Sequence, residues 1–253
     1  MHIACRFTFF YNIQQIQIPL VPYRRFPKTD TARLKSLGIL LDNNDVYVAE
    51  RRFLDMAKIN AAKLLYDKLK TLSSQFLLAY EAQMKNYQLI AKPQKNMMMF
   101  INHFMRVLCM SIERGEIKYS AIAEYYGVDD IDETMRQLHN VDYAYVQTPE
   151  IVRGEKQRVA AGGRPIYNPT IGMVATHYDI FKDVYEQQKI LNAKSERALA
   201  ELKALREEVD GLLVDVWNQV EAHFADVPPE QRFDECRRYG LIYYYRKGEK
   251  KPE

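Results

Sequence analysis

Two long tracts of the sequence carry apolar residues mostly at steps of three or four, and this spacing constrains the fold more than any other feature. The first tract, residues 46–91, contains neither proline nor glycine. The second tract, residues 168–226, begins at Asn168-Pro169, where Asn suits a helix N-cap and Pro suits the first turn. Three-four spacing places side chains on one face of an α-helix. We therefore predict two long amphipathic helices that pack against each other.

The predicted contact faces are two apolar stripes, with Asn60 as a polar exception in the first. The stripe of the first tract contains Phe53, Met56, Leu64, Leu69, Leu72, Phe76, Tyr80, Met84 and Tyr87. The stripe of the second tract contains Ile171, Val174, Tyr178, Phe181, Tyr185, Ala198, Leu202, Leu205, Val209, Leu212, Val216 and Val220.

Polar residues interrupt the second stripe between positions 188 and 196. Gln188, Asn192 and Ser195 occupy positions at which the three-four spacing predicts apolar side chains. We expect a bend or a frayed seam at this point. The sequence leaves open whether residues 168–226 form one helix or two.

Prolines predict two further helix boundaries. Pro93 predicts the end of the first long helix, because an interior proline removes a backbone hydrogen bond and clashes with the preceding turn. A methionine-rich helix is then expected over residues 94–113, with Gly115 as its stop. The segment Thr148-Pro149-Glu150 has the composition of a helix start, and this helix is expected to reach Ala161.

The rest of the chain predicts shorter elements. Leu241–Arg246 is a strand candidate that we expect to pair with residues 6–18, which mix aromatic and β-branched residues. Short helices are predicted at residues 31–40, at 120–126, at 133–138, and from Pro228-Pro229 to Tyr239.

These elements predict an all-α fold. We expect an elongated antiparallel helical bundle with two long coiled-coil-like helices and minor short strands at the N- and C-terminal ends. Residues 1–44 are expected to form an arm and a short helix, residues 45–247 the helical bundle domain, and residues 248–253 a polar tail.

The composition favours a soluble protein of the cytoplasm. Ten glycines and ten prolines in 253 residues imply long elements with few turns. The net charge of +3 is smaller than the positive charge that a general nucleic-acid-binding protein usually carries. Cys5, Cys109 and Cys236 are odd in number and far apart, which favours a reducing compartment. No apolar run approaches the length of a membrane span, and the first residues lack a clean signal peptide, so no membrane partner is expected.

No residue pattern predicts catalysis, a metal or a cofactor. The residues three before His103, His139, His177 and His223 are Phe, Arg, Val and Val, so the Glu-x-x-His pairs of di-iron bundles are lacking. The sequence also has no close cysteine pair for zinc and no Gly-x-Ser-x-Gly nucleophile motif. We therefore expect a protein that is not an enzyme.

The segment from Arg153 to Pro169 is the most distinctive stretch of the chain. It places cationic residues around a Gly-Gly pair just before the predicted helix start, where free backbone amides and guanidinium groups could hold an anion. The candidate anion-binding residues are Arg153, Lys156, Arg158, Gly162, Gly163 and Arg164. The alternative is a structural connector, in which Gly-Gly makes a tight turn and Arg164-Pro165 an extended exit.

The order of four short motifs resembles that of uncharacterised helical proteins of Bacteroidetes-type bacteria. The motifs are Ile112-Glu113-Arg114-Gly115-Glu116, Gly163-Arg164-Pro165-Ile166-Tyr167-Asn168-Pro169, Val216-Trp217-Asn218-Gln219-Val220-Glu221 and Cys236-Arg237-Arg238-Tyr239-Gly240-Leu241-Ile242-Tyr243. The resemblance covers about residues 45–247 and implies an all-α bundle and a bacterial origin. It implies no activity.

Two functions are consistent with these observations. The first is that of a non-enzymatic helical bundle that associates with protein, either a second copy or another partner. The 18 tyrosines suit such an interface, since each combines apolar area with a hydrogen-bonding tip. The alternative is binding of a phosphate-bearing ligand or nucleic acid through the basic connector at residues 153–168.

Overall fold

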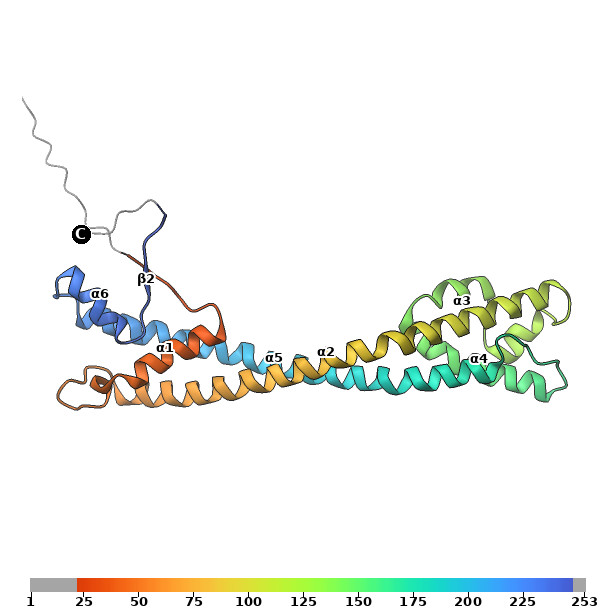
Figure 1. The fold of residues 1–253 in the computed structure, drawn as a ribbon, viewed down its shortest axis with the longest axis horizontal. Helices are drawn as coiled ribbons and strands as arrows, with labels where there is room; N and C mark the ends of the chain where they lie inside the picture. The colour runs from red at the N-terminus through yellow and green to blue at the C-terminus, as the bar shows by residue number, and fades with distance from the viewer. Residues whose placement is uncertain (1–21, 248–253) are drawn as a thin grey trace, which may run out of the picture. The chain divides into compact units, whose positions relative to one another are not determined.

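The two long tracts fold as α-helices that each bury one face. The computed structural model describes residues 22–247. Helix α2 spans Met56–Glu113 and helix α5 spans Ile171–His223 (Figure 1). The predicted all-α class, with two long helices and minor strands, is confirmed.

Shorter elements complete the described part of the chain. They are β1 (Tyr23–Arg24), α1 (Asp30–Asp42), the 3₁₀ turn η1 (Asn44–Val46), the π-helical turn η2 (Ile122–Tyr126), α3 (Ile131–Gln137), α4 (Val141–Ala160), α6 (Pro229–Arg237) and β2 (Tyr243–Tyr244). The short helices expected near residues 31–40, 133–138 and 229–239 are confirmed as α1, α3 and α6. The one expected at 120–126 is helical as well, with Ile122–Tyr126 in π-helical form.

The two short strands pair with each other. Tyr23 lies opposite Tyr244 and Arg24 opposite Tyr243, in antiparallel register. The C-terminal strand is therefore present but shorter than predicted, and its partner is β1. The expected partner strand at residues 6–18 and the expected tail at 248–253 lie outside the described residues.

The chain divides into two compact units, and both long helices contribute residues to each. Unit 1 combines the residues up to Lys70 with those from Leu205 onward, and unit 2 is Thr71–Ala204. The predicted arm over 1–44 and the single bundle domain over 45–247 stay predictions.

Within unit 1, ion pairs and apolar contacts hold α1 in place. The Thr29 hydroxyl accepts a hydrogen bond from the Ala32 amide and caps the start of α1. Arg33 donates to both carboxylate oxygens of Asp210 on α5, at 2.8 and 2.6 Å. Arg206 on α5 donates in return to both oxygens of Asp30, at 2.7 and 2.6 Å. The buried apolar residues of this unit include Leu37, Leu40, Ile59, Ala62, Val209, Leu213, Val216 and Trp217.

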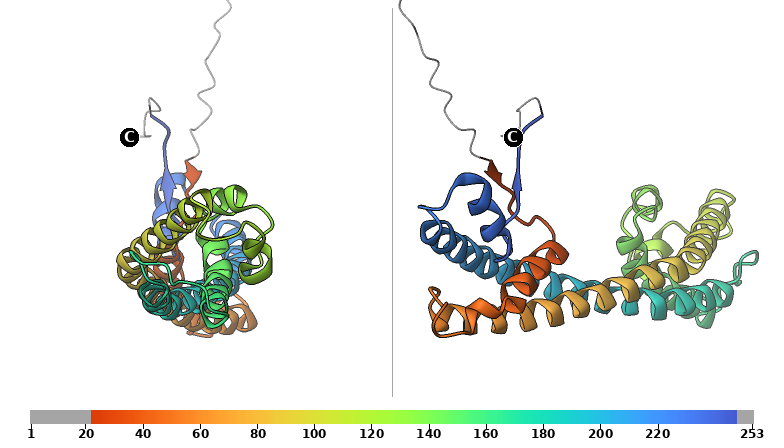
Figure 2. Two further views of the ribbon diagram at one scale, coloured as in Figure 1. Left: turned by 90° about the vertical axis from the view of Figure 1, so that its right-hand side faces the viewer. Right: turned by 60° about the vertical axis from the view of Figure 1, so that its left-hand side comes forward.

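Within unit 2, α3 and α4 pack with parts of α2 and α5 around one hydrophobic core (Figure 2). Its most buried side chains come from four elements of the unit, and Ile131 of α3 packs with them. They are Met97, Ile101, Phe104, Met105 and Leu108 of α2, Ile122 and Tyr126 of η2, Ala144 and Ile151 of α4, and Val174 and Phe181 of α5. Of the methionines of this stretch, Met97 and Met105 are fully buried, whereas Met99 and Met110 are exposed.

Helix α2 continues through Pro93, so the predicted helix end at this residue is wrong. Proline removes the hydrogen bond to the carbonyl of Leu89, four residues earlier, at a cost of about 3 kcal/mol. Leu89 is exposed, so its carbonyl group lies in a turn that faces water. Ile90 and Met97 are buried on either side of the proline, and their burial favours a continuous helix.

Pro149 also lies inside a helix, so the predicted helix start at Thr148 is wrong. Helix α4 begins earlier, where the Asn140 side chain caps the amides of residues 142 and 143. Pro149 leaves the carbonyl of Tyr145 without its helical donor, and the Tyr178 hydroxyl of α5 donates to that carbonyl at 3.0 Å. A tertiary contact thus replaces the missing backbone bond.

The buried seam of α2 differs from the predicted stripe. Leu64, Tyr80, Met84 and Tyr87 belong to the predicted contact face but are exposed. The residues of α2 that are buried between positions 59 and 90 are Ile59, Ala62, Leu65, Leu69, Ala79, Asn86 and Ile90. This seam also has three-four spacing, but small and polar side chains hide it from an apolar pattern.

The polar interruption of α5 is part of a hydrogen-bonded seam within unit 2, and the expected fraying is wrong because α5 is one helix. The Asn86 side-chain amide of α2 donates to the Gln188 side-chain oxygen at 2.7 Å and to the Val184 carbonyl at 3.2 Å. Gln188 and Gln83 both donate to the side-chain oxygen of Asn192, at 2.7 and 2.9 Å. The polar residues therefore satisfy one another across the two helices.

We predict that Asn86→Leu lowers the free energy of unfolding by about 1–3 kcal/mol, because it leaves the buried Gln188 side-chain oxygen without its donor. The double variant Asn86→Leu/Gln188→Leu should recover most of this loss, since it removes both buried polar groups. Urea denaturation of both variants measures the difference. Gln88→Leu, at an exposed neighbouring position, is the control and should change stability little. A double variant as unstable as the single one would contradict this account.

Candidate functional site

The Gly-Gly-Arg connector lines a cavity of about 530 Å³ within unit 2. Three of its lining residues are arginines and one is a glutamate. The cavity is lined by Val107, Ser111, Arg114, Glu116, Ile117, Arg158, Gly162, Gly163, Arg164, Pro165, Ile166 and Tyr167. Of the six predicted anion-binding residues, the structure brings together Arg158, Gly162, Gly163 and Arg164 in this lining.

The two glycines close the C-terminus of α4. Gly162 has a left-handed backbone with φ of 94°, a conformation that glycine adopts without strain. Its amide donates to the Val159 carbonyl, and the Gly163 amide donates to the Arg158 carbonyl, both at 3.0 Å. A Cβ at residue 163 would lie 2.6 Å from the Arg158 guanidinium, so a larger residue does not fit. Both amides are therefore used by the helix end and are not free to bind an anion.

The helix that follows the connector begins later than predicted. Helix α5 starts at Ile171, and the Thr170 side chain accepts from the Met173 amide at 3.4 Å. Asn168 precedes this turn in a left-handed conformation with φ of 58°. The predicted role of Asn168 as the N-cap is therefore wrong.

Arg158 is buried and bound by protein groups, so it is not a free cation. It donates to the two carboxylate oxygens of Glu155, both at 2.9 Å, and to the carbonyl of Arg164 at 2.7 Å. Its Nε also donates to the Tyr126 hydroxyl, which in turn donates to Glu155. The Ile166 amide donates to Glu155 at 3.0 Å, which joins the connector to the same network. This network binds the connector to α4 and η2.

The electrostatics of this network keep the Arg158 guanidinium charged and the Tyr126 phenol neutral. Burial lowers the pKa of Arg158, but its hydrogen bonds with Glu155 and Tyr126 outweigh that effect and raise the pKa overall. Burial, followed by the bond to Glu155, raises the pKa of the Tyr126 hydroxyl well above its ordinary value. Close packing supports the network, because a Cβ at Gly154 would lie 2.3 Å from the carbonyl oxygen of Tyr125 in η2.

Two other arginines supply the accessible positive charge of the cavity. Arg114 donates to both oxygens of Glu116, at 2.8 and 3.3 Å, and to the Ser111 hydroxyl at 3.3 Å. The bond from Arg114 lowers the pKa of Glu116, and the charge of Arg164 acts in the same direction. Arg164 is exposed, and its guanidinium makes no hydrogen bond or ion pair with another described residue. Arg164 is thus the guanidinium best placed to bind a ligand.

The remaining predicted residues lie elsewhere. Arg153 is exposed and forms an ion pair with Glu150 one turn earlier on α4. Lys156 is also exposed, and neither residue lines the cavity. Sequence reasoning missed Arg114, which directly follows the end of α2, because its approach to the connector depends on tertiary packing. The Glu155–Arg158 pair could have been found from its i, i+3 spacing on a helix.

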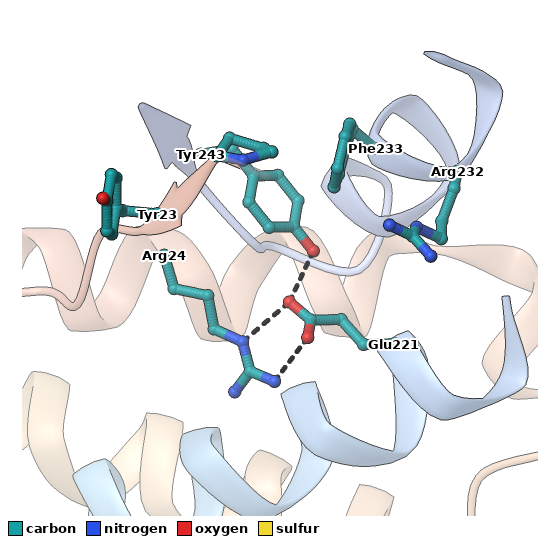
Figure 3. A pocket seen from close by; sticks show the side chains of 7 residues that line it. Tyr23, Arg24, Glu221, Arg232, Phe233 and Tyr243 are labelled. Atoms are coloured by element: carbon teal, nitrogen blue, oxygen red, sulfur yellow. Dashed lines mark hydrogen bonds and ion pairs between the residues drawn. The ribbon is translucent and has the colours of Figure 1, made fainter. Parts of the chain in front are cut away.

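A second cavity, of about 380 Å³, lies within unit 1 beside the short sheet (Figure 3). Arg24 of β1 donates to both oxygens of Glu221 on α5, and its third nitrogen donates to Asn218 at 2.7 Å. The Tyr243 hydroxyl of β2 also donates to Glu221, at 2.7 Å. These bonds outweigh the effect of burial and lower the pKa of Glu221.

The thiol beside this cavity is unsuited to catalysis. Cys236 is fully buried, and burial raises the pKa of its thiol. Burial, together with the bond to Glu221, also raises the pKa of the Tyr243 hydroxyl. A protonated, buried thiol is a poor nucleophile. We therefore interpret the group of Arg24, Glu221 and Tyr243 as a structural link between β1, β2 and α5.

The clearest surface feature of unit 2 is an apolar stripe on α2, on a side of the helix that does not contact α5. It consists of Leu77, Tyr80, Met84 and Tyr87, which we call the outer stripe. These four side chains are between 42% and 54% exposed, and their spacing of three, four and three residues aligns them along the helix. An exposed apolar stripe of this kind is typical of a protein–protein contact.

The comparisons add no known relative. No protein family model, curated protein or solved structure matches the chain. The resemblance to Bacteroidetes-type helical proteins therefore stays a prediction. Among residues 22–247, no helix combines the length and hydropathy needed to cross a membrane, and no cluster of three His, Cys, Asp or Glu residues is suited to a metal ion.

We predict that Glu155→Gln lowers the free energy of unfolding by about 3 kcal/mol, because it leaves the Arg158 charge buried without a counter-ion. The matched control is Glu150→Gln, which breaks an exposed pair of the same spacing on the same helix and should cost less than about 1 kcal/mol. Urea denaturation at neutral pH measures both. Equal losses in the two variants would show that the buried pair has no special role.

Proposed function

We propose that the chain is a non-enzymatic helical protein that works by associating with protein, either a second copy or another partner. The observation that carries this proposal is the outer stripe of α2. Four large apolar side chains in register on an exposed helix face are costly to leave in water, at roughly 25 cal/mol for each Å². Contact with a partner removes that cost.

The surroundings of the outer stripe support this proposal. Tyr80 and Tyr87 can bury their rings in a contact while their hydroxyl groups reach water. The two cavities described above have most of their charged groups already bound by protein partners. Chemistry on a substrate would need free catalytic groups there, whereas association needs none.

A paired substitution tests association. We expect Leu77→Gln/Met84→Gln to reduce the amount of the chain found in complexes above its monomer mass of 29.8 kDa. The measurement is size-exclusion chromatography with light scattering on clarified lysate from cells that express the chain. Leu78→Gln/Leu89→Gln, which changes two exposed leucines of the same helix outside the outer stripe, is the control and should leave the complexes intact. A chain that elutes as a monomer in lysate and when purified would contradict the proposal.

Binding of a phosphate-bearing ligand is a second candidate function, supported by the exposed guanidinium of Arg164 at the connector cavity. Arg114 contributes further positive charge, although it shares that charge with Glu116. The cavity volume of about 530 Å³ is in the range of small-ligand sites.

We expect Arg164→Ala to weaken binding of pyrophosphate by about tenfold or more, since one charge-assisted hydrogen bond is worth about 1.5–3 kcal/mol. Titration calorimetry with pyrophosphate and with a single-stranded oligonucleotide measures the effect for the two kinds of ligand. Arg153→Ala, an exposed arginine outside the cavity, is the matched control and should bind like the parent. Binding that is absent from the parent, or equally reduced in both variants, would rule out this site.

The bacterial origin and cytoplasmic location expected from the sequence belong to the same proposal. An antibody or tag on the chain, followed by cell fractionation, tests the location.

A further inference from the structure

The outer stripe is separated from the α2–α5 contact by its position around the helix. Residues 79, 83, 86 and 90 of α2 face α5, either buried or hydrogen-bonded to it. At about 100° per residue, the outer stripe lies roughly a third of a turn away from that seam. The stripe is therefore available to a partner without any opening of unit 2.

The charges around the outer stripe are few and balanced. Between residues 77 and 89 the sequence holds one acid, Glu81, and one base, Lys85. A partner that fits this face must therefore also be apolar and nearly neutral. The same stretch of a second chain has these properties.

The order of side chains in the outer stripe is self-complementary in the antiparallel direction. If two copies cross with the two-fold axis at the level of Ala82 along the helix, Leu77 lies opposite Tyr87, and Tyr80 lies opposite Met84. Each layer then combines one aliphatic side chain with one tyrosine, so the layers have equal volume. A parallel pairing would instead place tyrosine on tyrosine in two layers and aliphatic on aliphatic in the other two.

Charge complementarity also favours the antiparallel direction. In an antiparallel pair of helices, the same flank of each helix meets its counterpart, and Glu81 of one chain lies within one turn of Lys85 of the other. Two such pairs form, one on each side of the centre. In a parallel pair, Glu81 would meet the flank that carries Gln83, which has no charge.

The exposed area is that of a reversible dimer. A large apolar side chain offers about 200 Å², so four that are about half exposed contribute on the order of 400 Å² from each chain. That is about half the area of a standard interface per partner. Flanking polar side chains extend the contact. We expect a specific dimer of low affinity, whose amount depends on the protein concentration.

We propose that the outer stripe binds a second copy of this chain, with the two α2 helices antiparallel and a two-fold axis near Ala82. The inference rests on the proposed function of association and names its partner. Pairing two copies of this α2–α5 region would complete a four-helix arrangement, and two-fold symmetric dimers are the commonest oligomers.

Sedimentation equilibrium of the purified protein over a range of concentrations tests the partner. We expect a monomer–dimer equilibrium whose dissociation constant rises about tenfold or more in Leu77→Gln/Met84→Gln and stays unchanged in Leu78→Gln/Leu89→Gln. A purified chain that stays monomeric, while complexes persist in lysate, would overturn self-pairing and leave association with another protein standing. A dimer that both double variants weaken equally would overturn the assignment to the outer stripe.

Cysteine cross-linking tests the direction. Leu77→Cys and Tyr87→Cys should form an inter-chain disulfide when the two variants are mixed and oxidised, because the pairing places them opposite each other. Neither variant alone should cross-link above the parent, which keeps the native cysteines, since each residue lies about 15 Å along the axis from its own copy. Efficient cross-linking of each variant with itself would overturn the antiparallel arrangement, whereas the association function would stand.

Discussion

The seam between α2 and α5 is the constraint on which the rest of the structure depends. In unit 1 it contains aliphatic and small side chains such as Ile59 and Ala62, with the Lys58–Asp215 ion pair beside them. In unit 2 the seam contains the amides of Asn86 and Gln188, which bind each other directly. Small residues let the helices approach closely, and paired amides satisfy each other without water. Leu77, Tyr80, Met84 and Tyr87 of α2 are therefore not needed for the seam and remain on the surface.

The connector between α4 and α5 shows how a basic segment can be structural. Arg158 appears cationic and accessible in the sequence, yet its charge is neutralised by Glu155 and its donors are used by Glu155, Tyr126 and the Arg164 carbonyl. Burial of this pair is tolerated because the Tyr126 hydroxyl, the Ile166 amide and the Arg164 carbonyl add hydrogen bonds to it. The positive charge available to a ligand comes from Arg164 and in part from Arg114. The sequence had predicted that six residues would converge on one anion.

The interior and the surface of the protein therefore differ in the kind of function that they support. The two polar networks described above, around Asn86 and Gln188 and around Glu155 and Arg158, position helices through hydrogen bonds between protein groups. The outer stripe instead exposes apolar side chains to water at regular spacing along α2. Association is consistent with this division, because it uses shape and apolar area and requires no reactive group.

The sequence alone determined the helical class, the two long helices and most of the short elements, since three-four spacing and capping residues act locally. It misplaced both prolines: the cost at Pro93 is outweighed by buried neighbours, and the carbonyl freed by Pro149 receives a bond from distant Tyr178. It also chose the more hydrophobic face of α2 as the seam, because hydropathy cannot show that small and amide side chains match a partner helix. Which face is buried and which arginines are free were decided only by tertiary structure, since both depend on side chains contributed by elements far apart in the chain.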